Sequence, residues 1–113
     1  MSEKIEKANE AAVAEANTGV GTYVFKKPTK IDGEEVKEIN YDFNAINGAA
    51  IRDIRTELGK RAYAASVPEI DQVFQAGMFA VASGLTLDNV EAFGLRDYMA
   101  VTELARDFLL AEG

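Results

Sequence analysis

Seven consecutive small or apolar residues, 76–82, constrain the fold of this chain more than any other feature. They read Ala-Gly-Met-Phe-Ala-Val-Ala, so a helix built from them is apolar on every side. Such a helix has no face for water and must be surrounded by other elements. Gly84 predicts its end, and the capping-box pattern Ser66-Val67-Pro68-Glu69 predicts its start. We therefore expect a central helix from about Ser66 to Ser83.

Capping signals predict three further helices around this one. Asn47 is placed to cap a helix that begins just after it, and Thr86 to cap a very short one. Gly94 ends the short helix, and Asp97 falls in the first turn of a last helix that runs to about Ala111, where a negative charge suits the helix dipole. The second half of the chain thus predicts a small bundle of about four helices.

The segment before the helices has the signals of a β-hairpin. Residues 22–25 (Thr-Tyr-Val-Phe) and 35–41 are rich in aromatic and β-branched side chains, and Asp32-Gly33 is a turn pair. Residues 26–30, which contain Pro28, are expected to break the first strand. Because an isolated hairpin is marginal in water, it has to pack on the helices or pair with another chain. The fold class predicted is α+β, mainly α: an N-terminal hairpin followed by the bundle.

A length of 113 residues suits a single domain. Residues 2–18 are rich in Ala, Glu and Lys and have only Ile5 and Val13 as sizeable apolar groups. We expect a flexible arm at residues 1–21, with Gly19-Val20-Gly21 as its hinge, and one domain at residues 22–113. An arm that becomes ordered on a partner is the alternative.

The charge of the chain argues against nucleic acid as a partner. The net charge is −7, with eleven acidic and ten basic residues at positions 1–65 but eight acidic and two basic ones at positions 66–113. An acidic second half repels a phosphate backbone, whose binding requires a basic stripe. No apolar run approaches the length of a membrane span, and the polar N-terminus does not resemble a signal peptide. No membrane partner is expected, and the cytoplasm is the expected location.

The residues of the common catalytic and metal sites are missing. The chain has no Cys and no His, which excludes Ser-His-Asp and Cys-His arrangements and leaves only carboxylates for a metal. The acidic residues fall at expected helix caps and solvent-facing positions. We therefore expect no enzyme, no metal and no cofactor.

One DNA-binding alternative remains open. Ala80, Gly84 and Val90 have the spacing of a helix-turn-helix, in which residues 87–93 would form the recognition helix. That helix would present Leu87, Asp88, Asn89 and Glu91 to DNA, with Asp97 nearby, and acids without a base suit the groove poorly.

The order of these features resembles the tail assembly chaperones of long-tailed bacteriophages, over roughly residues 22–110. The most distinctive part is Gly84-Leu85, followed by Val90, Phe93 and the pair Asp97-Tyr98. The resemblance implies a protein of the infected cell's cytoplasm that binds the tape measure protein, holds it for polymerisation of the tail tube protein and leaves before the virion is complete. It implies no catalytic residues, and a structural tail completion protein is the alternative.

Two groups of residues are candidate interfaces for such a role. The last helix carries more apolar residues than one stripe needs, and exposed apolar patches mark partner surfaces. We expect Tyr98, Met99, Phe108 and Leu109 to bind the client or a second copy of the chain, whereas Met78 and Phe79 are expected in the core. A second hypothesis is that the basic residues Lys26, Lys27 and Lys30 of one subunit meet the acidic half of the next in a homo-oligomer.

Overall fold

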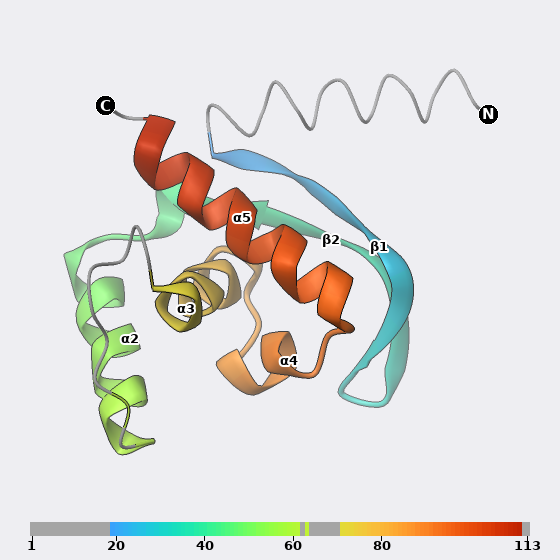
Figure 1. Ribbon diagram of the computed structural model, residues 1–113, viewed down its shortest axis with the longest axis horizontal. Coiled ribbons are helices and arrows are strands. Elements are labelled where there is room, and N and C mark those ends of the chain that lie inside the picture. Colours follow the sequence, from blue (N-terminus) through green and yellow to red (C-terminus); the bar gives the residue numbers. More distant parts are fainter. Residues whose placement is uncertain (1–18, 62, 64–70, 112–113) are drawn as a thin grey trace.

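The computed structural model describes residues 19–61, 63 and 71–111, and residues 1–18 of the predicted arm lie outside them. In these ranges the chain has the predicted α+β fold, an antiparallel hairpin followed by four helices. The hairpin is long and curved and runs along one side of the helices (Figure 1).

The hairpin pairs β1 (Val20–Ile31) with β2 (Glu34–Asp42). The predicted turn is confirmed: Asp32 and Gly33 have φ values of 53° and 85°, the left-handed backbone that a two-residue type I′ turn requires. Because β1 begins at Val20, the residues Val20 and Gly21 of the predicted hinge are strand residues. Gly21 faces Tyr41, whose hydroxyl lies 2.6 Å from the position a Cβ would take.

The predicted break of the first strand is wrong, because β1 continues through it as a bulge. Val24 pairs with Glu38 and Thr29 with Val36, so residues 25–28 lie opposite the single residue Lys37. Pro28 has no N–H to offer the ladder, and a bulge is where a strand tolerates that loss.

Local signals gave the helix ends correctly in most places. Asn47 caps α2 (Gly48–Lys60), its side chain accepting from the Ala50 amide at 2.9 Å. Thr86 and Asn89 form a capping box on α4 (Leu87–Glu91). A short turn, η1 (Phe43–Ala45), joins the hairpin to α2, and the last helix is α5 (Leu95–Ala111).

The central helix α3 (Gln72–Ser83) begins later than predicted. Asp71 is its N-cap, with an extended backbone and a side chain that accepts from the Phe74 amide at 3.0 Å. The start predicted at Ser66 is therefore wrong for this helix, and residues 66–69 lie outside the described part of the chain. The predicted end is confirmed by Gly84, whose φ is 76°.

The core forms around α3, as its composition predicts. Residues 74–80 are all buried, and α3 contacts α2, α4, α5, η1 and β2; it lies between the other helices in Figure 1. Met78 and Phe79 are 1% and 0% exposed, which confirms their place in the core. Gly77 lets α2 approach closely, because a Cβ there would lie 2.8 Å from Cγ2 of Ile54.

Candidate functional site

The predicted interface residues on α5 differ in how much surface they offer. Met99 is 51% exposed, whereas Tyr98, Phe108 and Leu109 are partly buried against the core. Phe108 stacks on Phe43 with ring centroids 5.4 Å apart. Met99 is therefore the exposed one of the four, with its sulfur accepting a hydrogen bond from Gln72 at 3.0 Å, and the other three lie at the edge of the core.

Two exposed apolar residues on α5 were not among the predicted interface residues. Leu95 is 75% exposed and Leu110 is 50% exposed. Leu95 lies four residues before Met99, so both are on one helix face one turn apart. The i,i+4 spacing of Leu95 and Met99, visible in the sequence just after Gly94, could have identified Leu95 as a neighbour of Met99.

The three lysines of the second hypothesis lie in and just after the β1 bulge. Lys26, Lys27 and Lys30 are all exposed. The backbone amides of Lys26 and Lys27 donate to the carboxylate of Asp97 at 2.8 and 3.2 Å. Asp97, at the start of α5, thus holds the bulge against the helices while the lysine side chains remain at the surface.

Asp97 lies in the first turn of α5, as predicted, but its side chain is buried, whereas the acidic residues were expected at caps and solvent-facing positions. Asp97 is 1% exposed and accepts a 2.6 Å hydrogen bond from the Tyr23 hydroxyl in addition to the two amides. Burial acts to raise the pKa of Asp97, but the hydrogen bonds from Tyr23, Lys26 and Lys27 outweigh it and lower the pKa below its ordinary value. Burial and the Asp97 charge both raise the pKa of Tyr23.

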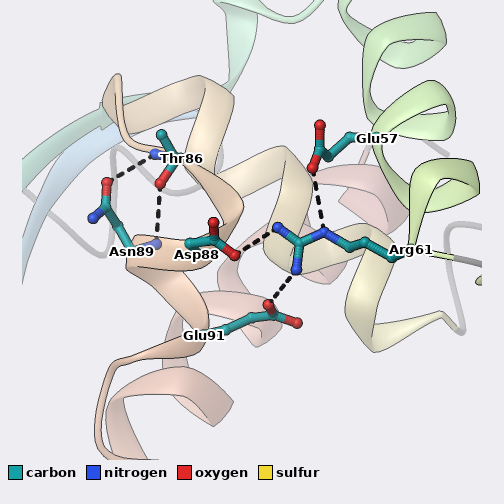
Figure 2. Close-up of polar contacts among 6 residues, drawn as sticks. All are labelled: Glu57, Arg61, Thr86, Asp88, Asn89 and Glu91. Atoms are coloured by element: carbon teal, nitrogen blue, oxygen red, sulfur yellow. Dashed lines mark hydrogen bonds and ion pairs between the residues drawn. The ribbon is translucent and has the colours of Figure 1, made fainter.

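A second polar cluster joins α2 to α4 around Arg61 (Figure 2). The Arg61 guanidinium contacts Asp88 at 2.7 Å, Glu91 at 2.9 Å and Glu57 at 3.4 Å. The same view shows Thr86 and Asn89 exchanging the hydrogen bonds of the capping box.

This cluster bears on the helix-turn-helix alternative. Leu87 is buried, Asn89 is used in the capping box, and Asp88 and Glu91 bind Arg61. The side chains that would read DNA are therefore engaged within the domain. The helix-turn-helix spacing around Gly84 marks the corner where α3 ends and the five-residue helix α4 follows.

Within 19–61, 63 and 71–111, no group of three or more His, Cys, Asp or Glu is placed to hold a metal ion. Among the helices in these ranges, none has the length and apolar character needed to cross a membrane.

The fold is a small hairpin-plus-helix domain with exposed apolar residues on α5. A family model described as "Phage tail assembly chaperone proteins, E, or 41 or 14" matches residues 22–110. The chain therefore belongs to the phage tail assembly chaperone family, which confirms the resemblance seen in its sequence. Membership implies protein partners in tail assembly and indicates a non-enzymatic role. No curated protein and no solved structure matches the chain.

Proposed function

We propose that this chain binds the tape measure protein in the host cytoplasm and holds it ready while the tail tube protein polymerises around it. The observation that carries the proposal is the family match, which covers the hairpin and all four helices. The protein then acts by binding alone and departs from the finished tail.

The exposed face at the start of α5 is the proposed contact with the client. Leu95 and Met99 are 75% and 51% exposed, and their neighbours on the surface of α5 include the charged residues Arg96 and Glu103. An apolar patch with a charged border suits a partner that presents apolar side chains of its own. Phe108 and Leu109 contribute at the other end of α5, where they support this helix on the core.

Co-expression with the tape measure protein tests the proposal. The wild-type chain is expected to copurify with the tape measure protein and to increase its soluble fraction. The double variant Leu95→Ser/Met99→Ser is expected to lose most of this effect while remaining folded. Val24→Ser is the matched control, because Val24 is also exposed (57%) but lies on the hairpin. Absence of copurification with the wild-type chain, or tight binding to duplex DNA at low salt, contradicts the proposed function.

A further inference from the structure

A groove of about 350 Å³ lies between α2, α3 and α4. Its apolar lining includes Ile54 of α2, Ala80 and Val81 of α3, and Leu85 and Leu87 at the corner that leads into α4. Val81 is 37% exposed, although it belongs to the helix at the centre of the fold. A volume of this size accommodates a few large apolar side chains.

The border of the groove is acidic. Asp53, Glu57 and Asp88 line it, and Arg61 is the one cation among the described lining residues. Arg61 already contacts both Glu57 and Asp88. Asp53 is apart from that cluster and lies 4.0 Å from Arg52, and both of these side chains are 76% exposed. The groove therefore has more negative than positive charge to offer a partner.

We propose that this groove binds an amphipathic helix of a partner protein whose apolar side chains are flanked by Lys or Arg. The apolar side chains would fill the apolar floor of the groove, which includes Val81. The cations would lie against Asp53 and against Glu57, whose contact with Arg61 is the longest of the cluster at 3.4 Å. The walls are helices whose backbone groups bond internally, so the groove provides no sheet edge for an extended peptide. A helix, which satisfies its own backbone, is the partner that fits. Taking that helix to be part of the tape measure protein rests on the proposed function.

The test uses two synthetic helical peptides of about 20 residues, long enough to be partly helical alone. Both carry the same Leu stripe, one with Lys and one with Glu beside it. In fluorescence anisotropy at low salt, the Lys peptide is expected to bind the whole chain and the Glu peptide to bind far more weakly. Asp53→Asn/Glu57→Gln is expected to lower the affinity for the Lys peptide by up to about fivefold for each lost ion pair. Val81→Ser is also expected to weaken binding of the Lys peptide, because it removes apolar surface from the floor of the groove.

The control is Glu35→Gln/Glu38→Gln, which removes two negative charges from the exposed surface of β2, away from the groove and from α5. Equal weakening by both double variants means non-specific attraction to an acidic protein and overturns the proposal. Unchanged binding by Asp53→Asn/Glu57→Gln or by Val81→Ser also overturns it. So does sedimentation showing that the chain self-associates through the groove, with association lost in Asp53→Asn/Glu57→Gln.

The same variants separate this inference from the proposed function. If the tape measure protein copurifies equally with wild type and with the groove variants, the groove is not its site, and the chaperone function stands. If the Lys peptide binds at the groove but the tape measure protein does not copurify, the groove inference holds and the proposed client is wrong.

Discussion

At the scale of single residues, Asp97 is a buried charge that links segments far apart in the sequence. Its carboxylate joins α5 to Tyr23, Lys26 and Lys27, which are about seventy positions away in the sequence. Nothing local distinguishes Asp97 from any acid in the first turn of a helix, where the dipole alone explains its presence. Its burial depends on the hairpin folding back over α5, which is a property of the tertiary structure.

Asp97→Ala is expected to destabilise the domain by about 3 kcal/mol, because it leaves two amides and a hydroxyl without their acceptor. Asp97→Asn is expected to cost about 1–2 kcal/mol, since the amide group keeps the shape but places a donor against a backbone N–H. Urea unfolding at neutral pH measures both. Equal stability of wild type and Asp97→Ala contradicts the described role of this carboxylate.

The pH dependence of the same comparison provides a further check. The folded pKa of Asp97 lies below its ordinary value of 3.8, so its ionised form stabilises the folded state. This contribution is complete above the ordinary pKa and is lost as the pH falls through the lowered folded pKa. The stability difference between wild type and Asp97→Asn is therefore expected to shrink from about pH 5 downward. A difference that grows on acidification contradicts this sign.

At the scale of elements, the helix ends were predictable where the capping chemistry is local. Asn47, Thr86 and Gly84 act within a few residues of themselves, so their roles are visible in sequence. The β1 bulge was not predictable, because the partner of its amides lies on another element. The start of α3 was misplaced because two segments, one at Ser66 and one at Asp71, offer a capping side chain, and sequence alone does not choose between them.

Replacing glycine by alanine is expected to have opposite effects on stability at two positions, Gly84 and Gly59. Gly84→Ala places a Cβ in the left-handed backbone at φ 76° and is expected to cost about 1 kcal/mol, although nothing obstructs the side chain. Gly59 lies in α2 with equally open space around it. Gly59→Ala is expected to stabilise the folded state by about 0.5 kcal/mol, because alanine lowers the conformational entropy of the unfolded chain. Thermal unfolding of both variants measures the signs, and a gain from Gly84→Ala contradicts the helix end assigned there.

At the scale of the whole molecule, the sequence predicted that a partner surface exists but not which residues form it. The excess of apolar residues on α5 indicated a partner surface, but the sequence did not reveal that Phe108 would stack on Phe43. It also gave no sign of the groove, whose lining comes from three helices and the corner between two of them. Local patterns identify helices and strands, whereas a binding surface depends on which faces the packing leaves open.

The separation of charge across the molecule leads to a last prediction about self-association. The exposed lysines of β1 lie on the hairpin, while residues 66–113 carry eight acids and two bases. If the lysines of one copy meet the acidic half of the next, association is expected to weaken strongly from about 0.05 M to about 0.5 M salt, because screening shortens the reach of exposed charges. Sedimentation equilibrium measures it. Lys26→Gln/Lys27→Gln/Lys30→Gln is expected to weaken association more than Arg52→Gln/Lys60→Gln/Arg106→Gln, which removes three exposed cations from α2 and α5. Association that salt leaves unchanged, or that both triple variants weaken equally, rules out the lysines of the bulge as the contact.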